Sequence, residues 1–344
     1  MNLSNVKPFI FCSVAILALV MSCLSGAVTT RADTPAKSPY ASDGPLNEPR
    51  IFGEGLISTP DNEFGGVFTP DGKEFYFTKS IPVSYFYAIF VSRFVNGKWT
   101  TPEIAPFSGH SRDFDAVISP DGSKMLFISD RPVNDQPKID YDIWIMDRTP
   151  DGWSEPRNLG EPIDTDGEEW FASFAANNTI YFAASERPGG KGGMDIYKSK
   201  LVDGKYSEPE NLGPSINTEA EEGEPAIAAD ESFLIFASGG RPESPGNWDL
   251  YISYNENGSW TPAKHLGPMF NTSARDYSPR LTPDGKYLFF TSERNFSTKP
   301  LQRPLSYNEL ETNLHGLLNG NGNIYQIDLA AVDEGLKARL EHKY

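Results

Sequence analysis

The chain of 344 residues is poor in the residues on which several common chemistries depend. It has two cysteines, Cys12 and Cys23, so residues 24–344 can form no disulfide and offer no thiolate ligand. Its four histidines form no His-x-His or His-x-x-x-His pair, which argues against a zinc site. The sequence also lacks a Gly-x-Ser-x-Gly elbow and a glycine-rich phosphate loop before a helix, so serine-hydrolase and phosphate-transfer chemistry are not indicated.

Positive charge is also scarce, because 30 lysines and arginines stand against 47 acidic residues, a net charge of −17. Nucleic-acid-binding proteins need basic patches, so we predict no nucleic-acid partner. The same charge disfavours binding to anionic membrane surfaces, although solubility alone can account for it.

Long apolar runs are limited to residues 9–24. This run has the length and flanks of a secretory signal peptide rather than of a membrane span. Its end, VMSC (20–23), resembles a bacterial lipobox with Cys23 as the lipidated residue, and ordinary cleavage a few residues later is the alternative. We predict a signal peptide over 1–23 and a flexible tether over 24–47. The protein should then be exported to the periplasm or cell envelope, with membrane contact only through the lipid anchor.

A Pro-Asp-Gly turn recurs through residues 48–330. Intact copies begin at Pro70, Pro120 and Pro283, and degraded copies begin at Ala176 and Ala229. The successive spacings are 50, 56, 53 and 54 residues. A steady period of that size indicates a propeller or a solenoid.

Each repeat contains four strand-like segments. An inner strand of small residues leads through the turn into an aromatic and β-branched strand, and an Asp-Ile-Tyr-like strand and an Asn-Gly or Asp-Gly hairpin follow. Five such repeats predict an all-β, five-bladed β-propeller over residues 48–330. The fifth repeat lacks a fourth strand, and residues 48–59 resemble the missing piece, so the N-terminal strand should close the ring. Residues 331–344 should form a C-terminal helix or tail.

The segment NLGPSINT (211–218), with Glu222 and Pro225 after it, resembles the TolB-like, WD-like propeller repeats of bacterial exported proteins. The resemblance covers about residues 49–329 and implies the propeller fold and a setting in the cell envelope. Members of that family are often six-bladed, which keeps six blades as the alternative. The resemblance implies no reaction, because one fold hosts many functions.

Two sets of charged positions follow the repeat on one face of the predicted propeller. An acidic residue precedes each inner strand, and these ring carboxylates should surround the channel mouth: Glu63, Asp113, Glu169, Glu222 and Asp276. A ring arginine ends the second strand of four blades: Arg131, Arg187, Arg241 and Arg294. In the first blade Ile81 takes that place, with Lys79 two residues earlier.

Two interpretations of this ring are open. Carboxylates about 10 Å apart repel by roughly 1.7 kcal/mol at an effective dielectric near 20, so the arginines can act as bidentate partners that hold each blade in place. Alternatively, the charged groups bind a polar ligand, with aromatic residues near the same face: Phe86, Tyr141, Trp170, Trp248 and Tyr277.

We predict a non-catalytic binding or scaffold protein that uses this carboxylate–arginine face to recognise a glycan, a peptide or an envelope protein. No cofactor is predicted, apart from calcium, for which residues 164–169 contain a partial loop pattern. The alternative is glycan cleavage by a glycoside hydrolase or polysaccharide lyase, with Asp113, Glu169 and Glu222 as the catalytic candidates. Two features weigh against it: the three positions are equivalent in the repeat, and a nearby arginine lowers a pKa that an acid catalyst needs raised.

The loop of the fifth repeat, residues 296–323, breaks the pattern by its length. Leucines between residues 310 and 318 have helical spacing, and Ser306 with Glu309 resembles a capping box. We predict a short helix that lies over the channel mouth or, equally, against the side of the blade.

Overall fold

The computed structural model describes residues 39–40, 45–81, 84–134, 136, 140–297 and 301–341. The predicted signal peptide lies outside these residues, as does most of the predicted tether. Within the described ranges, no helix has the length and apolar character needed to cross a membrane.

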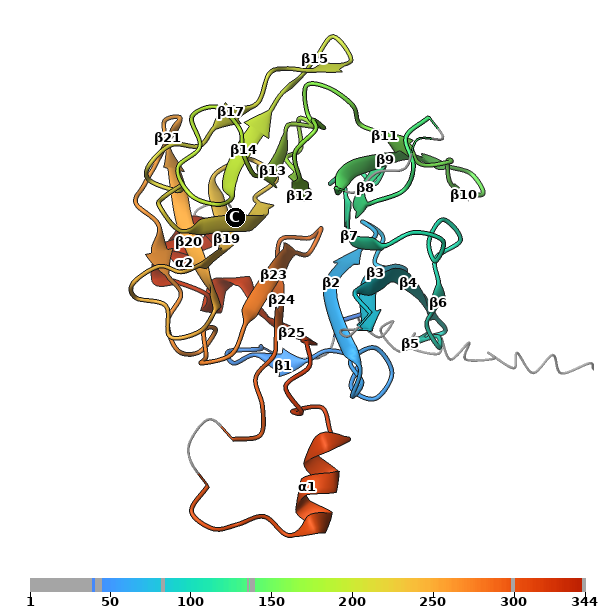
Figure 1. Ribbon diagram of the computed structural model, residues 1–344, viewed down its shortest axis with the longest axis vertical. Helices are drawn as coiled ribbons and strands as arrows, with labels where there is room; N and C mark the ends of the chain where they lie inside the picture. The colour runs from blue at the N-terminus through green and yellow to red at the C-terminus, as the bar shows by residue number, and fades with distance from the viewer. Residues whose placement is uncertain are drawn as a thin grey trace, which may run out of the picture. The chain divides into compact units, whose positions relative to one another are not determined.

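Five antiparallel sheets stand around a common centre, as Figure 1 shows. Blade 1 contains β2 (Asn62–Phe68), β3 (Glu74–Ile81), β4 (Phe86–Val95), β5 (Lys98–Trp99) and β6 (Glu103–Ile104). Blade 2 contains β7 (Asp113–Ile118), β8 (Lys124–Ser129), β9 (Asp142–Thr149), β10 (Gly152–Trp153) and β11 (Arg157–Asn158). Blade 3 contains β12 (Glu169–Phe174), β13 (Ile180–Ala184), β14 (Asp195–Ser199) and β17 (Glu210–Asn211), with a small hairpin of β15 (Leu201–Val202) and β16 (Lys205–Tyr206).

The last two blades repeat the plan. Blade 4 contains β18 (Glu221–Ile227), β19 (Phe233–Gly239), β20 (Trp248–Glu256), β21 (Ser259–Trp260) and β22 (Lys264–His265). Blade 5 contains β23 (Asp276–Leu281), β24 (Tyr287–Ser292), β25 (Asn323–Asp328) and, from the other end of the chain, β1 (Arg50–Ile51). The innermost strands β2, β7, β12, β18 and β23 neighbour one another around the ring.

The ring closes through the two ends of the propeller. β1 pairs antiparallel with β25, so that Arg50 lies opposite Gln326 and Ile51 opposite Tyr325. The described chain therefore confirms the predicted five-bladed propeller closed by its N-terminal strand, and it has five blades rather than six.

The recurring turns join the first two strands of each blade on one side of the ring, here called the turn face. In blade 1 the Thr69 hydroxyl donates to Asp71 at 2.7 Å, and Asp71 also accepts from the amide of Lys73. Gly72 has a φ of 67°, a conformation in which a Cβ is unfavourable. The side-chain bonds recur in blades 2 and 5, which explains why the same turn sequence returns there.

Every innermost strand contains a bulge two residues after its ring carboxylate. The strand register shifts there in all five blades, and the residue at this position has a φ between 47° and 65°. These bulge residues are Gly65, Asp115, Phe171, Glu224 and Ser278. A bulge re-aims a side chain, and four of these residues are not glycine, so the backbone is strained close to the axis.

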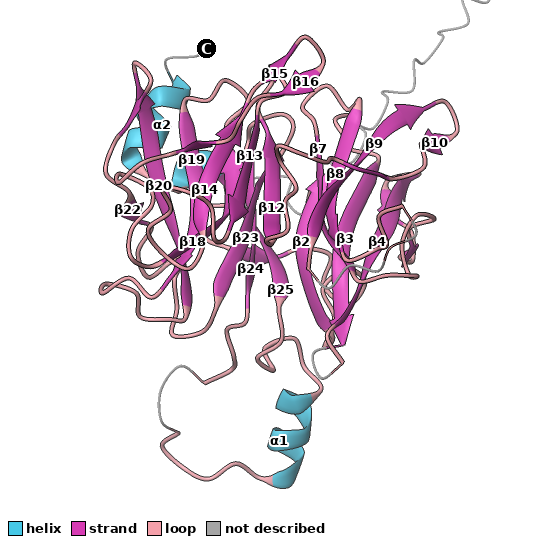
Figure 2. Cartoon of the chain, turned by 45° about the horizontal axis from the view of Figure 1, so that its top comes forward, coloured by secondary structure: helices cyan, strands magenta, loops and turns pink. Residues whose placement is uncertain are grey.

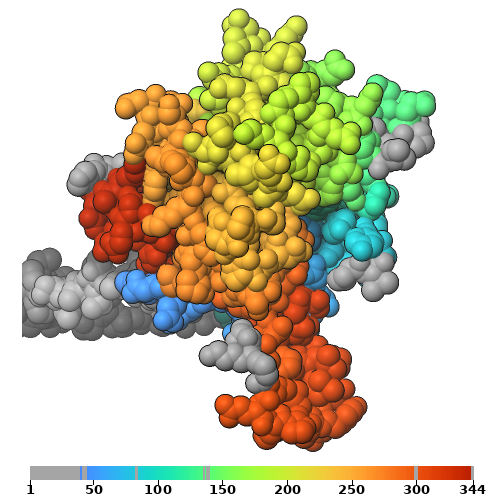
Figure 3. Space-filling model, turned by 60° about the vertical axis from the view of Figure 1, so that its left-hand side comes forward, coloured from blue at the N-terminus to red at the C-terminus, as the bar shows by residue number. Residues whose placement is uncertain are grey.

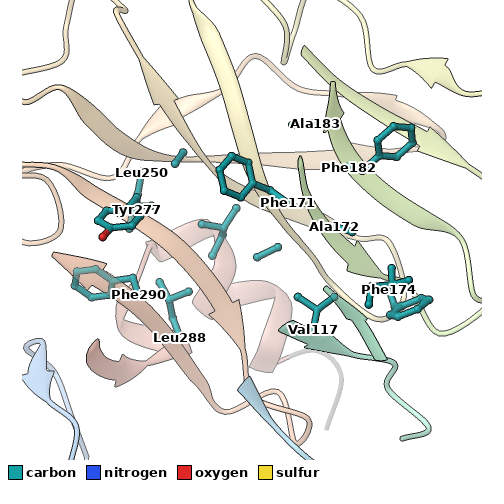
Figure 4. Packing of buried hydrophobic residues seen from close by; sticks show 14 of the residues in the cluster. Val117, Phe171, Ala172, Phe174, Phe182, Ala183, Leu250, Tyr277, Leu288 and Phe290 are labelled. Atoms are coloured by element: carbon teal, nitrogen blue, oxygen red, sulfur yellow. The ribbon is translucent and has the colours of Figure 1, made fainter. Parts of the chain in front are cut away.

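Apolar side chains fill the spaces between the blades. Figure 4 shows Val117, Phe171 and Tyr277 on facing blades around the centre of the ring. At the C-terminal end, η1 (Leu329–Ala331) and α2 (Glu334–Glu341) pack against the same core, with Leu336 fully buried. Burial of one leucine side chain contributes about 1.5–3 kcal/mol, so α2 is held to the propeller by packing.

The long loop of blade 5, residues 296–322, forms an arm that carries α1 (Tyr307–Leu314). The capping box is present, because Ser306 and Glu309 bond to each other's backbone amides. No residue of α1 is buried, and Figures 2 and 3 show it standing away from the blades. The predictions that this helix lies over the channel mouth or against the side of the blade are therefore both wrong. The segments on either side of α1 extend beyond the strand ends, so Leu310 and Leu314 stay exposed.

Candidate functional site

The five ring carboxylates are fully buried, each with an exposed fraction of 0%. Four accept hydrogen bonds from the threonine four residues earlier, and Asp113 accepts from Ser108 and Gly109. Each also pairs with a cation: Glu63 with Lys79, Asp113 with Arg131, Glu169 with Arg187, Glu222 with Arg241 and Asp276 with Arg294. Burial raises the pKa of Glu63, Glu169 and Asp276 in spite of these bonds.

Blade 4 shows how one ring pair holds its surroundings. The Arg241 guanidinium donates to Glu222 at 3.0 and 3.1 Å and to the carbonyl of Ile216 at 2.6 Å. It also lies over the ring of Tyr251, 4.5 Å from the centroid. The pair thus ties the segment before β18, which contains Ile216, to the hairpin of β18 and β19.

The other three ring arginines also donate to a carbonyl in the segment before their own blade: the carbonyls are those of Phe107, Ile163 and Phe270. Ile81, by contrast, is exposed, and Lys79 supplies the charge in blade 1. These bonds give the ring a structural role that requires no ligand. Ligand contact by the nine ring residues stays a prediction, as does catalysis by Asp113, Glu169 and Glu222.

A different set of residues lies on the axis, at the bulges. Two of the five bulge residues are acidic, Asp115 in blade 2 and Glu224 in blade 4, and both are 1% exposed. In blade 1 the position is Gly65, where an added Cβ would lie 2.5 Å from Asp115 Oδ1. Because the ring keeps the repeat and the bulges break it, the bulges are the better candidate for a specific site.

The acidic bulge residues line a pocket of about 290 Å³, here called the central pocket. It opens on the side of the ring opposite the turn face, here called the loop face. Its walls come from the innermost strands of all five blades and from neighbouring loops: Asn62, Phe64, Ser80, Tyr85, Tyr87, Phe114, Asp115, Trp170, Phe171, Glu224, Arg275, Tyr277 and Glu293.

Asp115 and Glu224 lie close enough to interact. The Ser278 hydroxyl donates to Glu224 Oε2 at 2.5 Å and also bonds to Asp115. Arg280 donates to Asp115 Oδ1 at 3.0 Å, but Asp115 Oδ2 and Glu224 Oε1 are buried without a hydrogen-bonding partner in the described chain. Burial and, to a smaller extent, the charge of Glu224 raise the pKa of Asp115 to about 7, against the opposing pull of Arg280.

Arg275 completes the polar part of the pocket. Its guanidinium is 3.7 Å from Glu224 Oε1 and lies over the rings of Tyr277 and Trp248, 4.1 and 5.5 Å from their centroids. Its Nε, like the free oxygens of the acid pair, has no hydrogen-bonding partner among the described residues. Burial raises the pKa of Glu293, and the attraction of Arg275 opposes this rise.

The predicted aromatic residues are placed in part as expected. Trp170 and Tyr277 line the central pocket, and the ring of Trp248 packs against the Arg275 guanidinium. Tyr141 packs against Trp170 with 4.9 Å between ring centroids. Phe86 follows Tyr85 at the mouth and is 38% exposed.

The other end of the channel, at the turn face, holds a second pocket of about 240 Å³ with mainly apolar walls. Leu340 of α2 is one of its lining residues, and Arg280 reaches it from the axis. The Arg280–Asp115 ion pair therefore separates the two pockets. The central pocket has the larger number of charged lining residues: Asp115, Glu224, Arg275 and Glu293.

One cluster in the described chain has the geometry to hold a metal ion. Oxygens of Asp142, Asp164 and Glu169 lie within 4.8 Å of one another, all in buried side chains. Asp164 accepts from the amides of Ile143 and Gly160, and Arg187 already pairs with Glu169. Asp164 and Glu169 are thus already engaged by other groups of the protein. Calcium binding stays a prediction.

The central acid pair was missed from the sequence, although a signal existed. Asp115 and Glu224 each stand two residues after a ring carboxylate, where the five repeats differ in residue type. Simple alternation along a strand places residues two apart on one face, so both would be assigned to the same ring. The bulge changes this direction, and nothing in the local sequence marks it.

No protein-family model matches this sequence, and no curated protein matches it. Among solved structures, a thermostable family-43 glycoside hydrolase has a TM-score of 0.51 at 10% identity, over 80% of this chain and 92% of that one. The putative TolB from Agrobacterium tumefaciens has a TM-score of 0.45 at 14% identity, over 78% of this chain and 91% of that one. An exo-beta-1,3-galactanase from Clostridium thermocellum has a TM-score of 0.46 at 12% identity, over 82% and 62%. Likeness at such identities shows the β-propeller fold alone.

Proposed function

We propose that this protein is an exported recognition propeller that binds a glycan in the central pocket. The observation that carries the proposal is the broken repeat at the bulges, which places Asp115 and Glu224 in the wall of the central pocket, each with one buried oxygen that has no hydrogen-bonding partner in the described chain. A sugar hydroxyl both donates and accepts hydrogen bonds, so it can bond to these oxygens and to Arg275 at once. The aromatic walls add apolar surface of the kind found in small-molecule sites.

The size of the pocket favours a glycan over a protein as the ligand. A volume of about 290 Å³ admits a small polar group, whereas a stable protein interface buries on the order of 1,200–2,000 Å². A peptide or an envelope protein would have to bind elsewhere on the surface. The ring residues, in this proposal, support the blades and do not touch the ligand.

The test is a thermal-shift screen of the purified protein against neutral, amino and uronic sugars and their oligomers. Ligand at about 100 times its Kd stabilises a protein by roughly 2.7 kcal/mol, which gives a visible rise in Tm. Binding that disappears in Glu224→Gln supports the central pocket. Binding that survives in Glu224→Gln and Asp115→Asn would contradict it.

Glycan cleavage is a second candidate, and the raised pKa of Asp115 beside Glu224 favours it. In a cleavage step Asp115 would give its proton to the glycosidic oxygen as the bond to the anomeric carbon breaks, and Glu224, held close to Asp115 by their shared Ser278 hydroxyl, would bond to that carbon. Water that loses a proton to Asp115 would then displace Glu224 from the carbon. This assigns the chemistry to Asp115 and Glu224 in place of Asp113, Glu169 and Glu222. A reducing-sugar assay on every oligomer that binds decides between binding and cleavage.

Export through residues 1–23 and lipidation at Cys23 are part of the proposal. The apolar run and the VMSC motif support them. Mass spectrometry of the protein purified from its native envelope would show removal of the first 22 residues and an acylated Cys23. An unprocessed N-terminus would contradict both.

A further inference from the structure

A glycan bound as proposed above would place only its end in the central pocket. Its volume of about 290 Å³ lies just below the range of about 300–1,000 Å³ that is typical of small-molecule sites. The Arg280–Asp115 ion pair lies between the central pocket and the pocket at the turn face. A longer chain whose terminal unit fills the pocket must therefore leave through the mouth on the loop face.

Tyr85 stands at that mouth, in the turn between β3 and β4. Its side chain lines the pocket and is nevertheless 65% exposed. Its backbone has a φ of 50°, which is rare for a bulky residue, and strain of this kind concentrates at ligand sites. Phe86 follows it, also exposed. Asn62, at the start of β2, also lines the pocket. Its side-chain amide donates to the Ser80 hydroxyl, and its side-chain oxygen accepts from the backbone amide of Gly322 at the end of the arm.

We propose that Tyr85 forms an outer subsite that stacks on the sugar unit next to the one in the central pocket. The proposal rests on the glycan function proposed above and narrows the ligand to an oligosaccharide. An aromatic side chain offers a large rigid contact surface at low cost in conformational entropy. An exposed tyrosine continuous with the pocket is placed to provide that surface.

The experiment measures affinity as a function of chain length by isothermal titration calorimetry. The probes are the one- to six-unit series of N-acetylglucosamine, glucose and xylose. Tyr85→Ala is compared with Tyr307→Ala, which removes a tyrosine that is 73% exposed on α1 and does not line the pocket. Since both side chains are exposed, both variants should fold, and circular dichroism melting curves check this.

We expect affinity to rise from one unit to two or three units and then to level off. Tyr85→Ala should weaken oligosaccharide binding about tenfold, the effect of truncating one aromatic contact, and should weaken single-unit binding by less, so that the gain in affinity with chain length shrinks. Tyr307→Ala should change neither. Equal affinity for one unit and six, or no loss in Tyr85→Ala, overturns the outer subsite while the pocket stands. Failure of every sugar to bind overturns the pocket and the outer subsite together.

Discussion

Glu222 and Glu224 lie two residues apart on β18, and we predict opposite effects when each is changed to glutamine. Glu222 accepts hydrogen bonds from Thr218, Ser238 and Arg241. Glutamine at this position leaves Arg241, whose side chain is 8% exposed, without its counter-charge. Breaking a buried ion pair in this way costs about 3–5 kcal/mol.

Glu224→Gln should change the free energy of unfolding by less than about 1 kcal/mol. Its Oε1 accepts no hydrogen bond in the described chain, and the Ser278 hydroxyl can still donate to an amide oxygen. Arg275, 3.7 Å from that Oε1, loses one counter-charge but keeps Glu293 and Asp115 nearby. The substitution also removes a buried charge next to Asp115. The same variant should lose the ligand-induced rise in Tm.

Urea unfolding followed by tryptophan fluorescence measures both variants, and the double variant Glu222→Gln/Arg241→Met serves as the control. Because the double variant leaves no unpaired charge, it should regain part of the lost stability. A cost below about 1 kcal/mol for Glu222→Gln would refute the structural role of the ring. A cost above about 3 kcal/mol for Glu224→Gln would refute the assignment of the bulge as a ligand site.

Three further predictions concern the bulges and the arm. Since burial raises the pKa of Asp115 from 3.8 to about 7, the native state holds more protons than the unfolded state between these values, and stability should fall with rising pH; urea midpoints at pH 5 and 8 should show this fall, and Asp115→Asn should reduce it without abolishing it, because burial also raises the pKa of other carboxyls, Glu169 and Glu293 among them. Gly65→Ala should destabilise the protein by more than about 1 kcal/mol in the same assay, because its Cβ would meet Asp115 at 2.5 Å in a left-handed backbone. Replacing both Leu310 and Leu314 by serine should leave the urea midpoint unchanged, since both side chains are exposed on α1; a fall would show that the arm packs on the blades.

The fold followed from features that every repeat shares. The Pro-Asp-Gly turns and the alternating strands are set by local backbone preferences, which recur with the same residues. The match of residues 48–59 to a missing outer strand was enough to predict closure by β1. Charge positions that keep the repeat, such as Glu222 and Arg241, could also be placed on one face.

The position of the arm and the acid pair could not be predicted in this way, because they depend on contacts between distant segments. Whether α1 lies on a blade depends on a matching apolar surface, which its own leucines do not reveal. Asp115 reaches the axis because its strand bulges, because Gly65 leaves room for it, and because Arg280 pairs with it. Those three conditions come from three different blades.

Closure of the ring also sets an order on folding. Arg50 in β1 pairs with Gln326 in β25, so the first strand of the described propeller cannot pair until its last strand has been synthesised. The entropic cost of bringing β1 and β25 together grows only slowly with the length of chain between them, but β25 must be synthesised before β1 can pair with it. Until then β1 has no sheet to join, and once β25 has formed, its outer edge stays open to other chains until β1 pairs with it. Blades 1–4 can form as the chain emerges, whereas the fifth completes only at the end, which makes the finished ring a late and all-or-none product of synthesis.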